Sequence, residues 1–210
     1  MRLHPLFALP ALACNPDEPP VELLRGSLGG RAFAARTVVF DEVGPAPGDT
    51  AEPTERTAQV VLVDSAGACP LLEPLYHLAW LRCESACEGL FAEQEAWPAG
   101  PMRTLWIGVT AGASATGYYE FALNESPGVF TARYRAVDLS PLMGLDAKTC
   151  LTACTEDHDF LWTATDDGQW GELQVETWGE AALEGSLNLL LSAGELEGAF
   201  AASRCEMGLY

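Results

Sequence analysis

Apolar and polar residues alternate along several segments of this chain, and this period of two limits the folds that it can adopt. In residues 104–110, Leu105, Ile107 and Val109 fall on the same side of an extended chain. Residues 129–137 alternate in the same way. Such alternation is typical of β-strands that bury one of their two faces. The sequence therefore predicts a mainly β protein.

The clearest predicted hairpin lies near the end of the chain. If Ala193-Gly194 is a two-residue turn, the numbers of paired residues sum to 387. One face of the hairpin is then apolar and the other polar except for Leu190. The apolar face holds Leu187, Leu189, Leu191, Leu196, Gly198, Phe200 and Ala202. A slip of one residue would reverse the two faces, so the pattern supports this arrangement.

Residues 73–93 differ from the rest of the chain, because their apolar residues recur at helical spacing and few of them are β-branched. The helix is expected to begin near Pro70 or Pro74 and to end before Trp97-Pro98. We therefore expect an antiparallel β-sandwich or a partly open barrel with one packed α-helix at about residues 73–93.

Length and composition are consistent with one folded domain. The chain has 210 residues, of which 49% are hydrophobic, and this is enough apolar material for a core. Its 30 acidic residues outnumber 11 basic residues and give a formal net charge of −19. So acidic a chain repels polyphosphate, which argues against nucleic-acid binding and against charge-driven binding to anionic lipid.

The first twenty residues indicate export. Residues 1–13 combine a short basic start with the apolar run PLFALPALA, which is too short to span a bilayer and is typical of a signal peptide. This leader ends at Ala11-Leu12-Ala13-Cys14, which resembles the lipobox of bacterial lipoproteins. In those proteins the cysteine receives acyl chains such as palmitate and becomes the new N-terminus. We expect a signal peptide at 1–13, lipidation of Cys14, a proline-rich tether at 14–20 and a single β-rich domain at 21–210.

The lipid would make the membrane the first partner of the protein. Asn15, directly after the cysteine, resembles the sorting pattern of outer-membrane lipoproteins in Gram-negative bacteria. The expected location is therefore the outer membrane, on its periplasmic or its surface side. Two alternatives remain open, namely an ordinary cleaved signal peptide on a secreted protein and an N-terminal strand with a chance cysteine.

Six further cysteines suggest a domain that is stapled by disulfides. They are Cys69, Cys83, Cys87, Cys150, Cys154 and Cys205. An even number of cysteines in an exported chain suggests up to three bridges, with 15 possible pairings. Spacing favours the local bridges Cys83–Cys87 and Cys150–Cys154, with Cys69–Cys205 joining distant parts. Residues i and i+4 of a regular helix are poorly placed for a disulfide, so a Cys83–Cys87 bridge would require a broken turn.

Several strand and turn motifs follow one another along the mature chain. They are Cys69-Pro-Leu-Leu at the opening of a helix, a Gly-Tyr-Tyr strand at 117–119, Cys150, and Gly185-Ser-Leu-Asn-Leu followed by Cys205. With this order and its leader, the chain resembles uncharacterised exported lipoproteins of high-GC Gram-negative bacteria. Cys83, Cys87 and Cys154 lie outside the shared pattern. The resemblance implies export and a β-rich domain, and it implies no particular activity.

One group of residues could bind a metal. Cys150, Cys154 and His158 would lie along one side of a helix, and thiolate and imidazole ligands suit zinc. No fourth ligand is near in sequence, and the thiols of an exported protein are expected to be bridged, so zinc is the alternative to a disulfide here. Because 62 residues separate the two C-x3-C motifs, the sequence argues against two such helices that are cross-linked to each other.

Two tryptophans are the favoured binding residues. If Asp167-Gly168 is a two-residue turn, paired residues sum to 335, and Trp170 and Trp178 fall on an otherwise polar face. Exposed aromatic rings among polar side chains can stack on sugars or anchor a protein partner. Since tryptophan is usually largely buried, the alternative is that another element covers these rings.

The sequence contains none of the common catalytic motifs G-x-S-x-G, H-E-x-x-H, the P-loop or the EF-hand loop. Outside the leader it has two histidines, His77 and His158, and His77 is expected to be packed on its helix.

The sequence thus favours a lipid-anchored envelope protein with a structural or binding role toward a protein or glycan, without a cofactor and without enzymatic activity. The first alternative is an exported hydrolase or metal-binding protein that uses carboxylates or the Cys150, Cys154 and His158 group. A calcium-stabilised domain is the second.

Overall fold

Ten strands and three α-helices make up the described part of the chain, which comprises residues 24–43, 55–111, 115–123 and 128–208 of the computed structural model. The strands are β1 (Arg25–Leu28), β2 (Arg31–Ala34), β3 (Thr37–Glu42), β4 (Arg56–Val63), β5 (Met102–Ala111), β6 (Gly117–Phe121), β7 (Val129–Val137), β8 (Trp162–Trp178), β9 (Ala182–Leu191) and β10 (Gly194–Arg204). The helices are α1 (Cys69–Ala79), α2 (Cys83–Ala92) and α3 (Ala147–Glu156), with short 3-10 turns at Gln94–Ala96 and Ser140–Leu142.

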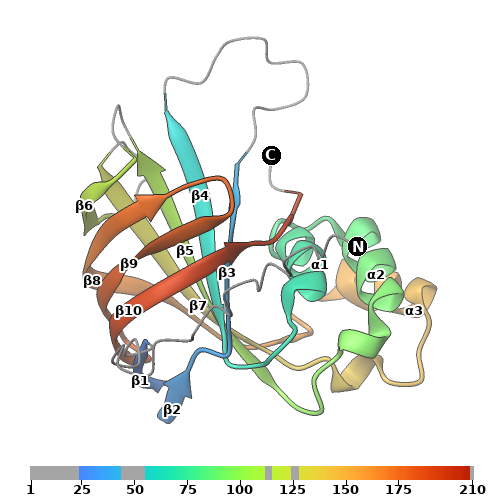
Figure 1. Cartoon of the computed structure of the whole chain (residues 1–210). Helices are drawn as coiled ribbons and strands as arrows, with labels where there is room; N and C mark the ends of the chain where they lie inside the picture. The colour runs from blue at the N-terminus through green and yellow to red at the C-terminus, as the bar shows by residue number, and fades with distance from the viewer. Residues whose placement is uncertain (1–23, 44–54, 112–114, 124–127, 209–210) are drawn as a thin grey trace, which may run out of the picture.

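The strands form one mixed sheet in the order β2-β1-β10-β3-β4-β5-β7-β6-β8-β9. Additional pairings of β9 with β10 and of β7 with β8 curl this sheet into a partly closed ring (Figure 1). The ring closes weakly where β10 meets β3, because these two parallel strands pair only at Ser203 and Arg204 of β10. The predicted mainly β fold is confirmed in this form.

Apolar side chains pack on both faces of the sheet. Inside the ring, Leu105, Ile107 and Val109 of β5 belong to one large cluster, as their alternation predicts. On the outer face, Val61 of β4 and Trp106 of β5 belong to a second cluster that includes the helices. Figure 1 shows the three helices gathered on one side of the ring. The central strands therefore alternate between two buried faces, whereas strands away from the helices alternate between core and solvent.

The last hairpin is confirmed, with a turn one residue earlier than expected. Gly194 pairs with Leu191, so the turn is Ser192-Ala193 and paired residues sum to 385. Because this sum differs from the expected 387 by two, the same side chains share each face. The predicted apolar face is buried at Leu187, Leu189, Leu191, Leu196, Phe200 and Ala202, and Leu190 is exposed.

The single helix expected at residues 73–93 is wrong in its extent, because the chain forms two helices there. The break lies at Leu81, whose φ of 60° is left-handed and incompatible with a continuing helix. It reverses the chain so that α2 packs against α1, where a Cβ on Gly89 would lie 3.0 Å from the Pro74 ring. The third helix, α3, was not expected, although Asp146 caps it by accepting a hydrogen bond from the Thr149 amide. No helix in the described ranges is long and apolar enough to cross a membrane.

The hairpin expected at Asp167-Gly168 is also wrong, because β8 continues through these residues as one strand. The first part of β8 pairs with β7, and the part from Gly168 onward pairs with β9. Gly168 lacks the positive φ that a type I′ turn needs, and it lies so close to Phe121 that a Cβ would be 2.5 Å from that ring. The glycine therefore serves a close contact within the sheet and not a reversal of the chain.

Candidate functional site

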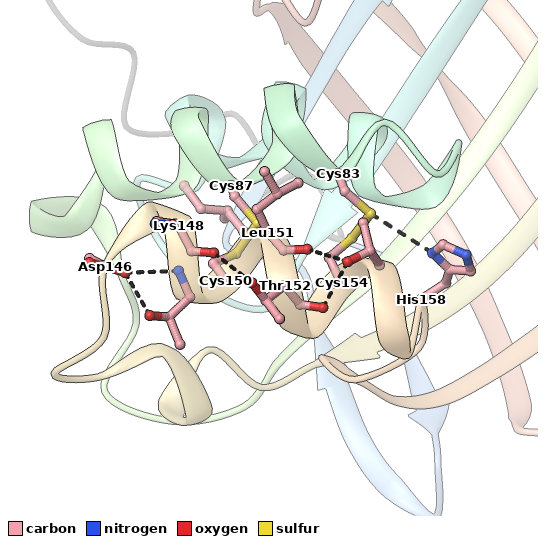
Figure 2. The surroundings of a disulfide bond; sticks show 12 residues. Cys83, Cys87, Asp146, Lys148, Cys150, Leu151, Thr152, Cys154 and His158 are labelled. Carbon is pink, nitrogen blue, oxygen red and sulfur yellow. Dashed lines mark hydrogen bonds between the residues drawn. A yellow bond between two sulfur atoms is a disulfide. The ribbon is translucent and has the colours of Figure 1, made fainter.

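Two disulfides join α2 to α3, and a third joins the first residue of α1 to Cys205, directly after β10. Cys69 pairs with Cys205, as the spacing predicts, whereas the two expected local bridges are wrong. Cys83 instead pairs with Cys154 and Cys87 with Cys150. Figure 2 shows why: the two cysteines of α2 project from one side of that helix toward the two cysteines of α3. A residue spacing of four places side chains on the same side of a helix, where they reach a neighbouring helix and not each other.

Helices α2 and α3 are thus cross-linked twice, although the separation of their C-x3-C motifs argued against such a scaffold. The Cα–Cα distances are 5.7 and 5.8 Å, within the usual range for a disulfide. All six cysteines of the described domain are oxidised. Several structural disulfides in one domain indicate an extracytoplasmic protein, because cytosolic reductants keep such thiols reduced.

The alternative zinc group of Cys150, Cys154 and His158 is not assembled as the sequence suggested. Cys150 is bridged to Cys87, and it is Cys83 that lies beside His158, with 3.8 Å between its Sγ and the His158 Nδ1 (Figure 2). Cys83, Cys154 and His158 bring their potential ligand atoms within 4.8 Å of one another. The two sulfurs are bonded to each other, however, and zinc requires thiolates. These residues therefore do not fit a metal in the oxidised protein.

The two predicted binding tryptophans do not share a face. Trp170 is half exposed, but Trp178 belongs to the core inside the ring. The pairing of β8 with β9 shifts between Val175 and Thr177, and this bulge turns Trp178 inward. There its indole Nε1 donates a hydrogen bond of 2.8 Å to the Glu42 carboxylate.

The positions of the remaining predicted residues are simpler. His77 is buried beside Glu73, as expected for a packed histidine. Cys14 lies outside the described residues.

A cleft of about 320 Å³ lies on the outer face of β4, β5 and β7, next to the end of α1. Its floor is set by the register of these strands, in which Gln59 pairs with Gly108 and Gly108 with Thr131. Gly108 leaves room for its neighbours, because a Cβ there would lie 2.7 Å from the Thr131 Oγ1 and 3.0 Å from the Gln59 Nε2. An amide and a hydroxyl thus converge over a strand position that has no side chain.

Aromatic rings form one wall of the cleft. The ring of Tyr76 lies 6.1 Å from that of Trp80 and 6.3 Å from that of Trp106. Trp80 follows the end of α1 and is 62% exposed, which is unusual for so large an apolar side chain. Trp106 is held in place because its Nε1 donates to the Thr104 hydroxyl at 3.0 Å. Phe121 also lines the cleft.

Two arginines of β7 line the cleft beside the aromatic wall. Arg133 forms an ion pair of 2.5 Å with Asp167 of β8. Arg135 makes no ion pair with any described residue, its Nε is buried without a hydrogen-bond partner, and its guanidinium lies 4.9 Å from the centre of the Trp162 ring. Burial lowers the pKa of Arg135 to about 10, and the neighbouring charge of Arg133 acts in the same direction. Arg135 remains charged at neutral pH.

Sequence reasoning missed this site. The alternation in residues 129–137 places Arg133 and Arg135 on one face of a strand, and that signal was available. The aromatic wall was not visible in the same way, because Tyr76 and Trp80 reach the cleft only through the packing of α1 on the sheet.

The chain matches no protein-family model, no curated protein and no solved structure. The geometry of the cleft is therefore the basis for a functional proposal.

Proposed function

We propose that this protein is an extracytoplasmic binding module and that its ligand site is the cleft over β4, β5 and β7. The observation that carries the proposal is the composition of this cleft, in which the Gln59 and Thr131 side chains converge on a floor beside the Tyr76, Trp80 and Trp106 rings. Concave sites with aromatic walls and a few convergent polar groups are typical of small-ligand binding.

A lipid anchor would hold this module at the cell envelope. The support is the leader that ends at Cys14 and the proline-rich tether after it, together with the resemblance to exported lipoproteins. The three disulfides are consistent with this address, because they need an oxidising compartment. In this proposal the protein is an outer-membrane lipoprotein that presents its cleft to solutes of the envelope.

The binding role is tested by following the indole NMR signals of the full, oxidised chain during titration with ring compounds. The panel contains neutral sugars, aromatic acids, aromatic amides and aromatic amines. At least one class is expected to shift the signals of Trp80 and Trp106, since these rings line the cleft. If no class shifts either signal, the proposed binding site is wrong.

The chain offers a matched pair of variants for this experiment. Trp80 and Trp170 are both exposed, but only Trp80 lines the cleft. Trp80→Ala is therefore expected to weaken binding, whereas Trp170→Ala leaves it unchanged. An equal loss in both variants would contradict a site at the cleft.

The anchor is tested separately by the intact mass of the protein from the membrane fraction of a Gram-negative host. The mature polypeptide is expected to begin at Cys14 and to carry acyl chains, and Cys14→Ala is expected to leave the membrane fraction. A mature chain that begins elsewhere and carries no lipid would reject the anchor without affecting the proposed cleft.

A further inference from the structure

We propose that the ligand of the cleft carries a carboxylate on a flat apolar body, and that Arg135 pairs with this carboxylate. The inference rests on the proposed function and specifies its ligand class. It is carried by the balance of charges in the cleft, by the state of the Arg135 side chain and by the aromatic wall next to it.

The charges in the cleft differ from those of the rest of the molecule. The chain as a whole carries a formal net charge of −19, yet this cleft is lined by two arginines and one carboxylate. Asp167 forms an ion pair with Arg133, and no described carboxylate forms an ion pair with Arg135, on which Asp167 and Asp159 act only at longer range. The lining of the cleft thus carries one more arginine than carboxylates, and one anionic group would balance it.

The surroundings of Arg135 favour a carboxylate as that group. The side chain is half-buried, and the charge of Arg133 repels it, while Asp167 and Asp159 attract it from a distance without forming an ion pair with it. A partly buried guanidinium without a paired anion is unfavourable, and a carboxylate on its terminal nitrogens would restore its charge balance, whereas the buried Nε is out of reach of a ligand in the cleft. Stacking on Trp162 restricts the guanidinium, so less side-chain entropy is lost when the anion binds.

The aromatic wall defines the rest of the ligand. The rings of Tyr76, Trp80 and Trp106 lie beside the arginines and present apolar surface, which a flat ring can cover. The Gln59 amide and the Thr131 hydroxyl offer a donor and an acceptor to a polar atom of that ring. A polyphosphate is disfavoured, because its larger charge would be repelled by the acidic molecule around the cleft.

The experiment compares three probes that share one ring and differ in the charge of their head group. Indole-3-acetate is negative, indole-3-acetamide is neutral and tryptamine is positive. Each is titrated into the full, oxidised chain, and the indole signals of Trp80 and Trp106 are followed. We expect the acetate to bind roughly tenfold more tightly than the acetamide, in line with a partly buried charge-assisted pair. Tryptamine is expected to bind most weakly.

Arg135→Gln is expected to remove the preference for the acetate and to weaken the acetamide much less, because the amide loses at most a neutral hydrogen bond. Arg135→Lys keeps the charge but not the planar fork, so an intermediate preference is expected. Arg25→Gln, at an exposed arginine of β1 outside the cleft, is the control for the loss of one positive charge and should keep the full preference. A thermal melt of each variant shows that it is folded.

The results that overturn the inference differ from those that overturn the proposed function. If the acetate and the acetamide bind the cleft equally, or if Arg135→Gln keeps the preference, the cleft stands as a binding site and the carboxylate is wrong. If none of the three probes binds, the flat aromatic body is wrong, and the wider panel of ring compounds then decides whether the cleft binds any ligand at all.

A carboxylate on an aromatic body can belong to a free acid or to the C-terminus of a polypeptide that ends in an aromatic residue. N-acetyl-Gly-Gly-Trp and its C-terminal amide distinguish these sources. Tighter binding of the peptide acid than of indole-3-acetate points to a polypeptide end, and the reverse order points to a free acid. Equal binding of peptide acid and peptide amide would contradict the pairing with Arg135.

Discussion

At the scale of single residues, the cleft depends on one position that has no side chain. Gly108 sits between Gln59 and Thr131 across three strands, and both side chains occupy the space over its Cα. The φ of Gly108 is not in the left-handed region, so the backbone itself would accept another residue. It is the two polar neighbours, and not the backbone conformation, that require glycine here.

Gly108→Ala is therefore expected to damage the site more than the fold. The new methyl group would displace the Thr131 hydroxyl and the Gln59 amide, whose atoms lie 2.7 and 3.0 Å from its position. We expect the melting temperature to change little and the affinity for indole-3-acetate to fall by about tenfold. Unchanged affinity in a folded variant would show that the floor is not part of the site.

A second residue-scale prediction concerns Glu42. Burial alone would raise the pKa of this carboxyl, but hydrogen bonds from Arg56 and Trp178 outweigh it and lower the pKa. A lowered pKa in the folded state stabilises the protein above the unfolded pKa, and this contribution is lost as the pH falls through the folded pKa. Glu42→Gln should thus cost stability at pH 7 and much less at about pH 3.

Urea denaturation at the two pH values measures this difference. Because both partners in the ion pair are partly exposed, the effect at pH 7 should be under about 1 kcal/mol. Glu55→Gln is the control, since Glu55 is an exposed acid that forms no ion pair with another described residue. A Glu42→Gln effect that grows as the pH falls would contradict the assigned cause.

At the scale of elements, two covalent bonds join α2 to α3 within the helical layer. Each helix is only ten residues long and would be marginal by itself. The two bridges join their cysteines in antiparallel order, Cys83 with Cys154 and Cys87 with Cys150. Buried Leu90 and Ala86 of α2 lie in the same apolar cluster as these cysteines.

Peptide mapping without reduction tests this pairing. Cleavage at Glu84 separates Cys83 from Cys87, and cleavage at Leu151 separates Cys150 from Cys154, so every pairing gives distinct linked peptides. We expect masses for the two cross-links between the helices. Linked pairs within 83–87 or within 150–154 would contradict the arrangement of α2 and α3.

Removing one of these bridges should destabilise the protein to a measurable extent. Cys87→Ala with Cys150→Ala opens a loop with a sequence separation of 63 residues, and a loss of about 2–4 kcal/mol is expected in guanidinium denaturation. Ligand affinity should change little, because neither cysteine lines the cleft. A variant with wild-type stability would show that the bridge constrains nothing.

At the scale of the whole molecule, a large negative charge acts against a compact fold. The formal net charge is −19, and the acidic residues are spread over the surface of the ring and the helices. Self-repulsion of this size destabilises the folded state, and salt screens it. The two apolar clusters and the three disulfides oppose this repulsion.

Salt is therefore expected to stabilise the protein. Raising the sodium chloride concentration from about 0.05 M to about 0.5 M shortens the Debye length from about 14 Å to about 4 Å, which removes most repulsion between distant charges. The melting temperature should rise over this range. A fall would mean that attractive ion pairs, such as Arg133 with Asp167, outweigh the net charge.

Local patterns determined much of the fold. The alternation in β5, β7 and the last hairpin is a property of neighbouring residues in the sequence, so it predicts which side chains share a face even where the turn is displaced by one residue. The even number of cysteines likewise predicted a disulfide-stapled domain, and the distant pair Cys69–Cys205 was confirmed.

Features that join distant segments were decided only in the tertiary structure. The partners of Cys83 and Cys87 depend on α3 lying beside α2, and the burial of Trp178 depends on a bulge in the pairing of β8 with β9. The cleft is the clearest case, because its floor needs the register of three strands and its wall needs α1 packed on them. A sequence pattern specifies the direction of a side chain along its own element, whereas the side chains that it faces are set by packing between elements.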